Sequence, residues 1–248
     1  AVDNLEVSDK TKRYYETAIK DFTRFTVKNT PARDPLETLD LTQARSRERY
    51  AFTTSEISKL LTHTKQADAL LGVSGYDRYL LYRFAVETGF RASEIRALRV
   101  RDFDLKKGSV KLSGKYTKNG KTAILKLKPT MVLELKKRFK TSLPQKEAFV
   151  LPSRWNMAEM LREDVRAAEV DISEDRIGDK IVDFHSLRHT AATLLANNGV
   201  SPYKLQKIMR HKNIETTMQY YDDESEDSSE IEKMPDFDIN EQQAAETA

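Results

Sequence analysis

One strand-like stretch lies between long stretches of helical spacing. Residues 108–127, "GSVKLSGKYTKNGKTAILKL", alternate apolar and polar side chains around Asn119-Gly120, a dipeptide typical of hairpin turns. Helical periodicity occurs on both sides of it, at 10–29, 53–65, 77–98, 130–140, 156–169, 185–197 and 202–209. The sequence therefore predicts an α+β fold, mainly α-helical, that carries one small antiparallel β-sheet.

Local signals predict where several helices begin or end. "TTSE" is a capping box and predicts a helix that begins after Thr53. Gly89 interrupts the periodicity of 77–98, so a short second helix is expected after it. Ser201 and Pro202 form an N-cap followed by a proline in the first turn, which predicts a helix through Met209.

The chain divides into three segments. Residues 1–50 are expected to hold one amphipathic helix and a polar linker, and residues 51–221 the main domain. Residues 222–248 have low hydrophobicity and are expected to be a mobile acidic tail. The chain opens on "AVDNL" without an initiator methionine, so we expect a fragment or a processed product.

The net charge of +3 conceals an uneven distribution. Residues 222–248 contain eleven acidic residues and one basic residue, Lys233. Of the 42 basic and 39 acidic residues in the chain, 41 basic and 28 acidic residues therefore belong to residues 1–221, a net charge of +13. A body this basic predicts a polyanionic partner, usually nucleic acid, although a solvated basic surface is the alternative.

Cysteine is absent, which excludes disulfides and thiolate metal sites and favours a reducing compartment. No apolar run approaches the roughly 18 residues that a membrane-spanning helix needs. We therefore expect a cytoplasmic protein with no membrane partner.

Three of the four histidines, His185, His189 and His211, lie close together in the sequence. His185 and His189 have the spacing of zinc ligands on a helix, but Ser186 stands where a zinc protease has its glutamate. Anion binding fits better, because the planar guanidinium of Arg188 matches phosphate oxygens and His185 lies on the same helix face. His189 points about 100° away and is expected to be structural. A satisfied helix histidine beside a surface arginine is the plain alternative.

Four motifs occur in a specific order along the chain. They read "ETGFRASEIRALRVRDF" at 87–103, "YTKNGK" at 116–121, "HSLRHTAATLLANNGV" at 185–200 and "MRHKNIETTMQYY" at 209–221. Together they resemble the tyrosine recombinase (phage integrase) family, whose catalytic half carries an early arginine box, a hairpin lysine, an "HxLRHT" box and a tyrosine soon after a second histidine. The resemblance covers about residues 53–221 and implies the fold of that family's catalytic domain.

The resemblance implies a role for each matching residue. A tyrosine attacks a DNA phosphodiester to give a 3′-phosphotyrosyl link, so rejoining needs no metal or nucleotide cofactor. Arginines and a histidine stabilise charge on the phosphate, a second histidine manages the tyrosine proton, and a lysine protonates the leaving oxygen. The expected catalytic residues are Tyr220, Arg91, Arg188, His211, His185 and Lys118, with Glu94 orienting the site and with Arg91, Lys118 and Arg188 binding DNA.

Some positions leave alternatives open. Lys118 has two neighbouring lysines, Lys115 and Lys121, that could take its role. Arg210 stands where the family usually has glycine, which adds charge beside His211. Tyr221 is adjacent to the expected nucleophile, but neighbouring side chains on a helix diverge by about 100°, so only one of the two tyrosines can face a given phosphate.

The resemblance implies a site-specific DNA recombinase: an integrase, a resolvase or the recombinase of a mobile element. A type IB topoisomerase-like strand cutter and an inactive DNA-binding protein of the same fold are the alternatives. The implied partner is double-stranded DNA, bound as a homotetramer on paired sites in the nucleoid. Residues 1–50 resemble the end of a truncated N-terminal DNA-binding domain. The tail could dock on a neighbouring protomer, cover the basic face as a DNA mimic, or act only as a solubilising end.

Overall fold

A computed structural model of the chain describes residues 9–28, 34, 36–37, 48–117, 120–141, 147–153 and 156–221. Within these ranges the secondary structure is mainly helical, with one small sheet, as predicted. The helices are α1 (Asp9–Val27), α2 (Thr54–Gln66), α3 (Gly75–Thr88), α4 (Ala92–Ala97), α5 (Pro129–Thr141), α6 (Met157–Ala167), α7 (Glu174–Ile177), α8 (Phe184–Asn197), α9 (Pro202–Met209) and α10 (Glu215–Met218). The strands are β1 (Phe103–Asp104), β2 (Ser109–Leu112) and β3 (Ala123–Lys126), and two 3-10 helices span Val100–Asp102 and Gly114–Tyr116.

The predicted helix ends are mostly confirmed. The Thr53 side chain accepts a hydrogen bond from the Glu56 amide, and the Glu56 carboxylate accepts one from the Thr53 amide, which completes the capping box of α2. Gly89 ends α3 in the left-handed conformation. α3 begins earlier than the periodicity indicated, because the Ser74 side chain caps it. The short helices α7 and α10 were not predicted.

The sheet differs from the expected tight hairpin. Its order is β1-β2-β3, all antiparallel, and Leu112 pairs with Ala123 across the connection. The alternation expected through residues 113–122 was wrong, because Gly114–Tyr116 form a 3-10 helix there. The Thr117 hydroxyl donates to the carbonyls of Gly114 and Lys121, at 3.0 Å each, so side-chain hydrogen bonds replace the ladder. Asn119 and Lys118, on which the predicted turn depends, lie outside the described residues.

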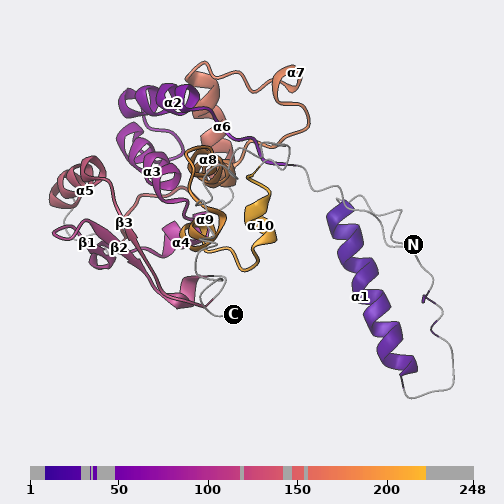
Figure 1. The fold of residues 1–248 in the computed structure, drawn as a ribbon. Coiled ribbons are helices and arrows are strands. Elements are labelled where there is room, and N and C mark those ends of the chain that lie inside the picture. The colour runs from indigo at the N-terminus through magenta and orange to yellow at the C-terminus, as the bar shows by residue number, and fades with distance from the viewer. Residues whose placement is uncertain are drawn as a thin grey trace, which may run out of the picture.

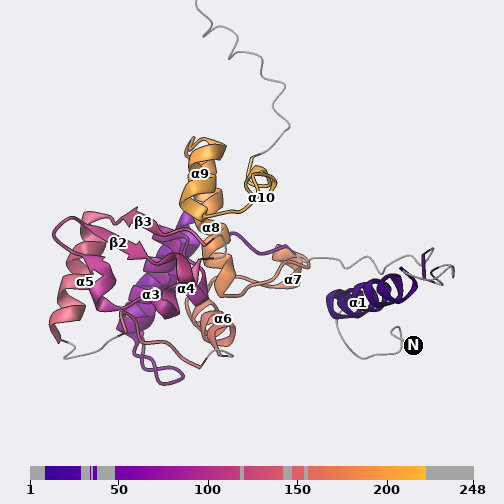
Figure 2. The ribbon, with the colours of Figure 1, turned by 90° about the horizontal axis from the view of Figure 1, so that it is seen from below.

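Helix α3 forms the centre of the core. It packs on α2 and α8 and buries Leu80, Leu81 and Phe84 completely or nearly so. Figures 1 and 2 show the sheet and α5 on one side of α3 and α8, with α6 and α7 on the other. In both views α9 and α10 lie together at one end of this body, and α1 lies apart from it.

A buried ion pair joins α3 to α6. Arg78 donates two hydrogen bonds to the Asp164 carboxylate, at 2.8 and 3.1 Å, and the Tyr82 hydroxyl donates a third at 2.7 Å. The remaining Arg78 donors reach the carbonyls of Asp68 and Val73. This cluster is fully satisfied, as a buried charge pair must be to persist.

A second apolar cluster lies between α8 and α9. Its buried members include Ala191, Leu205 and Met209. Tyr220 and Tyr221, which follow α10 directly, pack against it. The cluster therefore fixes the position of both tyrosines relative to α8.

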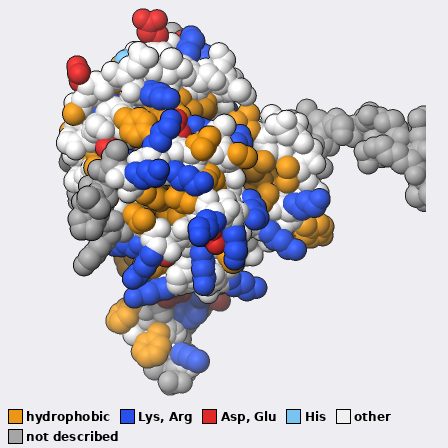
Figure 3. Space-filling model, turned by 90° about the vertical axis from the view of Figure 1, so that its left-hand side faces the viewer, with side chains coloured by type: hydrophobic (Ala, Val, Ile, Leu, Met, Phe, Trp, Pro, Cys, Tyr) orange, Lys and Arg blue, Asp and Glu red, His pale blue; other side chains and the backbone are white. Residues whose placement is uncertain are grey.

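Exposed lysines are numerous on the face that α5 and the sheet form. Figure 3 shows Lys and Arg side chains spread over this face among exposed apolar ones. Ile124 of β3 and Leu133 of α5 are 68% and 58% exposed. None of the helices in the described ranges is long and apolar enough to cross a membrane.

Candidate active site

The turn between α3 and α4 presents one carbonyl to two arginines. Gly89 has φ 61° and ψ 24°, and a Cβ there would come within 2.6 Å of the Met209 sulfur. Its carbonyl accepts hydrogen bonds from Arg188 and from Arg210, the latter at 3.1 Å. The left-handed backbone conformation therefore favours glycine here, and a larger residue would also have to displace the end of the Met209 side chain.

Arg91 and Glu94 are held together at the start of α4. The Glu94 carboxylate accepts from the Arg91 amide and from its guanidinium, each at 2.8 Å. Glu94 is 1% exposed, whereas the Arg91 side chain is 21% exposed. Burial would raise the pKa of Glu94, but Arg210 and Arg91 lower it below its ordinary value. Glu94 is thus an anion that fixes the Arg91 side chain by one end.

Arg188 is a buried cation without a carboxylate partner among the described residues. It lies on α8, which Asp183 caps by accepting from the amides of His185 and Ser186. Arg188 is 2% exposed and donates to the carbonyls of Gly89 and Met209. Burial, followed by the charges of neighbouring arginines, lowers the pKa of Arg188 to about 9, so the group stays charged at neutral pH.

His185 and His211 are neutral at pH 7. Burial, with the positive charges of Arg49 and Arg188, lowers the pKa of His185 to about 4. Burial and three nearby arginines have the same effect on His211, whose pKa is also about 4. Nδ1 of His211 lies 2.9 Å from the Thr217 hydroxyl, which orients the ring. Either imidazole can therefore accept a proton or a hydrogen bond at one nitrogen.

Tyr220 lies between two imidazole rings. Its ring is stacked on that of His211 at 6.2 Å and inclined to that of His189 at 5.0 Å. Burial raises the pKa of Tyr220, while Arg188, Arg49 and Arg91 act in the opposite direction. Its hydroxyl has no hydrogen-bond partner among the described residues, whereas the Tyr221 hydroxyl donates to the Val200 carbonyl. The two tyrosines thus differ: one hydroxyl is occupied and the other is not.

Sequence reasoning missed the contact of His189 with Tyr220 and the backbone conformation of Arg210. His189 was expected to be structural, but its ring lies 5.0 Å from that of Tyr220, so it belongs to the surroundings of the expected nucleophile. Its Nδ1 is buried without a partner in the described structure. Arg210 has φ 56°, a left-handed conformation that costs a non-glycine residue about 1 kcal/mol. In the sequence, the signal for this position was that Arg210 stands where the family usually has glycine.

Arg49 also acts on the site from outside the motifs. Its backbone pairs with Ile181, and its Nε lies 3.3 Å from a carboxylate oxygen of Asp183, the cap of α8. Its positive charge lowers the pKa values of His185 and Tyr220. No sequence pattern singled it out, because only the pairing of residues 48–50 with Ile181 brings it there.

The expected residues are thus partly assembled. Arg91, Glu94 and Arg188 are connected by hydrogen bonds through Arg210 and the Gly89 carbonyl, and Tyr220 stacks on His211, the residue after Arg210. His185 lies in the first turn of α8, within the electric field of Arg188. Lys118 lies outside the described residues.

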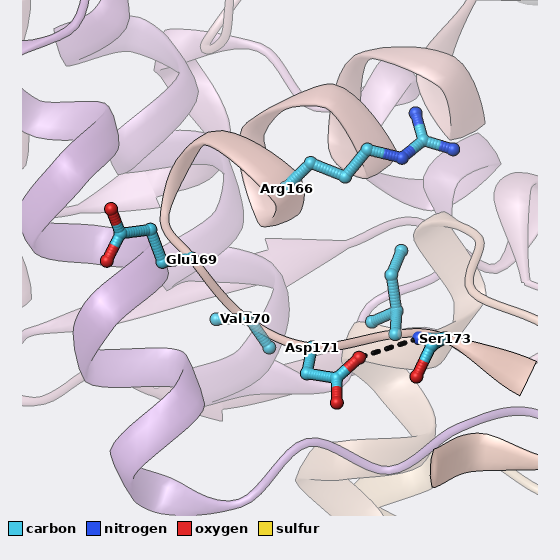
Figure 4. A pocket seen from close by; sticks show the side chains of 6 residues that line it. Arg166, Glu169, Val170, Asp171 and Ser173 are labelled. Carbon is cyan, nitrogen blue, oxygen red and sulfur yellow. Dashed lines mark hydrogen bonds between the residues drawn. The ribbon is translucent and has the colours of Figure 1, made fainter. Parts of the chain in front are cut away.

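The described surface has several hollows. A groove between β3 and α9 has Arg210 and His211 among its lining residues, together with lysines of both elements. A second hollow, between α6 and α7, is lined by Arg166, Glu169 and Asp171 (Figure 4), and Asp171 there accepts from the Ser173 amide. Only the first adjoins the arginine cluster. The described residues contain no group of three or more His, Asp or Glu that could hold a metal ion.

Comparison with known proteins identifies the family of this chain. Residues 51–227 match the model of the Phage integrase family. Tyrosine recombinase XerA of Saccharolobus solfataricus is 28% identical over 222 residues, which are 88% of this chain and 65% of that protein. Tyrosine recombinase XerC of Staphylococcus haemolyticus is 29% identical over 144 residues, 58% of this chain and 48% of that protein. The chain thus spans about half to two thirds of the length of these relatives.

The fold has a close counterpart among solved structures. A structure of the Tn1549 transposon integrase in complex with a circular intermediate DNA superposes with a TM-score of 0.73 at 19% identity, covering 92% of this chain and 81% of that one. The fold is therefore that of a tyrosine recombinase catalytic domain. Because the family match covers most of the chain and the motif residues converge as described, this chain belongs to the phage integrase family.

Proposed function

We propose that this chain is a site-specific DNA recombinase that cleaves and rejoins DNA through a 3′-phosphotyrosyl intermediate. The observation that carries the proposal is Arg188, a buried cation that has only carbonyl partners in the described structure and lies in the same cluster as Arg91 and Tyr220. A buried charge without a counterion is costly and is retained where a ligand supplies the opposite charge. A phosphodiester supplies it here.

Each residue then has a defined task. The Tyr220 oxygen attacks the phosphorus, and the bond from phosphorus to the 5′-oxygen breaks, leaving a 5′-hydroxyl. Arg91, Arg188 and His211 stabilise charge on the nonbridging oxygens. The neutral imidazole of His185 accepts the tyrosine proton, and Lys118 protonates the departing 5′-oxygen. Glu94 orients Arg91. Rejoining reverses these steps, so no metal or nucleotide cofactor takes part in the proposed reaction.

The proposed partner is double-stranded DNA. The net charge of +13 on residues 1–221 and the lysines of the sheet and α5 support this partner. The Tn1549 integrase, whose fold is similar, was solved in complex with a circular intermediate DNA, and lambda integrase residues 75–356 were solved as a dimer bound to a COC' core site. Strand exchange between two sites requires a homotetramer, with a C-terminal segment docking on a neighbouring protomer and the complex residing in the nucleoid.

We assign different roles to successive segments of the chain. Residues 51–221 catalyse, and residues 1–50 are the last helix and linker of a DNA-binding domain. In α1 the exposed residues Tyr14, Phe22 and Phe25 are 66–75% exposed, which supports an unpartnered helix of such a domain. The tail, 222–248, lies outside the described residues.

The test is covalent trapping on DNA. The full chain is incubated with a pool of nicked duplexes of randomised sequence, in which cleavage releases a short 5′-hydroxyl fragment and prevents rejoining. We expect a protein–DNA adduct that survives detergent and is lost in Tyr220→Phe. Tyr221→Phe is the matched control, since its hydroxyl is already bonded to Val200, and it should retain the adduct.

Four results would contradict the proposal. No adduct from the unmodified chain, or an adduct from Tyr220→Phe, would exclude this nucleophile. Relaxation of a supercoiled plasmid without exchange between two duplexes that carry the trapped sequence would show a topoisomerase-like strand cutter instead. Binding of the pool without any adduct would show a DNA-binding protein.

A further inference from the structure

Arg210 occupies a position whose backbone favours glycine. It ends α9 with φ 56° and ψ 41°, and its amide donates to the carbonyls of Gln206 and Lys207. Glycine is the usual residue at such a helix end, because L side chains rarely adopt this conformation. An arginine here therefore indicates that its side chain makes contacts that offset the unfavourable backbone.

The guanidinium of Arg210 is enclosed on every side that the structure describes. It donates to Glu94 at 2.8 Å, to the Gly89 carbonyl at 3.1 Å and to the Ile208 carbonyl at 2.6 Å. It also lies 4.3 Å from the centre of the Phe90 ring. Because Arg210 is only 4% exposed, its side chain cannot itself bind a DNA backbone. Its contacts are with groups that hold other arginines.

Arg210 is the link between the two arginines of the proposed phosphate site. The Gly89 carbonyl accepts from both Arg210 and Arg188. The Glu94 carboxylate accepts from both Arg210 and Arg91. The Arg210 guanidinium therefore binds both the Gly89 carbonyl and the Glu94 carboxylate. These two acceptors also hold the guanidiniums of Arg188 and Arg91.

Charge balance gives Arg210 a second effect. Glu94 is 1% exposed, so its negative charge must be compensated within the protein. With Arg210 present, that charge is shared between two guanidiniums, and Arg91 keeps attraction for an incoming anion. Without Arg210, Glu94 would be compensated by Arg91 alone, and the attraction of Arg91 for phosphate would fall.

We propose that Arg210 is a positioning residue of the active site: it neutralises Glu94 and sets the spacing of Arg91 and Arg188 for the two nonbridging oxygens of a phosphodiester. This inference rests on the proposed function for its substrate. It assigns a role to an arginine at a position where the family resemblance has glycine. A lysine could not replace it, because a single ammonium lacks the planar fork that reaches Glu94, Gly89 and Ile208 together.

The test compares Arg210→Gln with Arg96→Gln, a half-buried arginine of the same region whose contacts are with Pro152 and Met157. Cleavage is measured at saturating nicked DNA, and DNA affinity separately. We expect Arg210→Gln to lower the cleavage rate constant by about 10- to 100-fold, with DNA affinity changed by less than about threefold. Arg210→Lys should behave like Arg210→Gln, and Arg96→Gln should cleave like the unmodified chain.

A second substitution separates positioning from mere support of the fold. Glu94→Gln alone should slow cleavage, but in the Arg210→Gln background it removes the negative charge that only Arg91 would compensate and should recover about tenfold of the loss. If Arg210 only supported the fold, the fold-decreases in cleavage rate caused by Glu94→Gln and by Arg210→Gln would multiply in the double variant. Multiplying losses, or cleavage by Arg210→Gln at the unmodified rate, would overturn the proposal.

Binding of orthovanadate, a phosphate mimic, provides a readout that does not need DNA cleavage. Titration calorimetry should show about tenfold weaker binding to Arg210→Gln than to the unmodified chain or to Arg96→Gln. If the unmodified chain forms no DNA adduct, the proposed function fails while this comparison still tests Arg210. Equal orthovanadate affinity in all three proteins would overturn the inference even if the adduct forms.

Discussion

Two buried arginines of the same domain, Arg78 and Arg188, have opposite charge environments. Each is 2% exposed. Arg78 has a carboxylate of its own, Asp164, which Tyr82 also contacts. Arg188 has only backbone carbonyls as hydrogen-bond partners, and Glu94, the nearby carboxylate, is already shared by Arg91 and Arg210. The first cluster is electrically complete and the second is short of one or two negative charges.

The difference separates structural from functional burial of charge. A complete pair such as Arg78–Asp164 holds elements together and gains nothing from a ligand. An incomplete cluster carries excess positive charge, which an anion can neutralise. Substitutions in the first cluster should therefore change stability, and those in the second should change chemistry.

Removing the carboxylate of the complete pair should have the largest effect. Asp164→Ala leaves Arg78 buried without a counterion, so the free energy of unfolding should fall by about 3–5 kcal/mol. Urea denaturation measures the change. Asp164→Asn keeps the side-chain volume and some hydrogen bonds and should lose less. A fall below about 1 kcal/mol in Asp164→Ala would mean that the two clusters do not differ as described.

Removing the accessible arginine of the incomplete cluster should affect chemistry more than stability. Arg91→Ala should slow covalent cleavage about 10²- to 10³-fold, equivalent to about 3–4 kcal/mol, because one preorganised donor to the phosphate is lost. Its unfolding free energy should fall by only about 1 kcal/mol, since Arg210 still holds Glu94. Single-turnover cleavage of nicked DNA measures the rate. Arg166→Ala, which removes an exposed arginine paired with Glu163, is the control and should leave the rate unchanged.

Acid should weaken the incomplete cluster through its histidines. The folded pKa values of His185 and His211 are about 4, below the ordinary 6.5, so the unfolded chain binds more protons between these values. The free energy of unfolding should therefore be unaffected by these groups above about pH 6.5 and fall as pH decreases toward 4. At pH 5.5 the loss is about 1 kcal/mol for each histidine.

Urea denaturation between pH 7.5 and 5 tests this dependence on the histidines. His185→Asn should remove about half of the decrease, and the variant with both histidines replaced should remove most of it. An unchanged decrease in the doubly substituted chain would show that other groups are responsible.

Much of the fold could be predicted from local signals. The capping box at Thr53, the break at Gly89 and the proline after Ser201 depend on nearby residues only, and each ends or begins a helix as expected. The four-residue helices α7 and α10 have too little periodicity to be recognised. The connection between β2 and β3 was misread because Thr117 competes for backbone partners that alternation alone cannot reveal.

The motifs predicted a set of site residues, but they could not predict the surroundings of those residues. The helical spacing of His189 did not predict its contact with Tyr220, because that contact depends on how α10 packs. Arg210 was visible only as a departure from glycine, and its bond to Glu94 spans more than a hundred residues of sequence. Arg49 reaches the site only through the pairing of the linker with Ile181.

The shared carbonyl of Gly89 has a consequence for protein synthesis. Its two arginine donors follow it by 99 and 121 residues, so neither bond can form until almost all of the domain has left the ribosome. Contacts this distant in sequence form late in folding. A nascent or prematurely terminated chain would lack the assembled arginine cluster. The chain therefore acquires its arginine cluster only when translation of the domain is nearly complete.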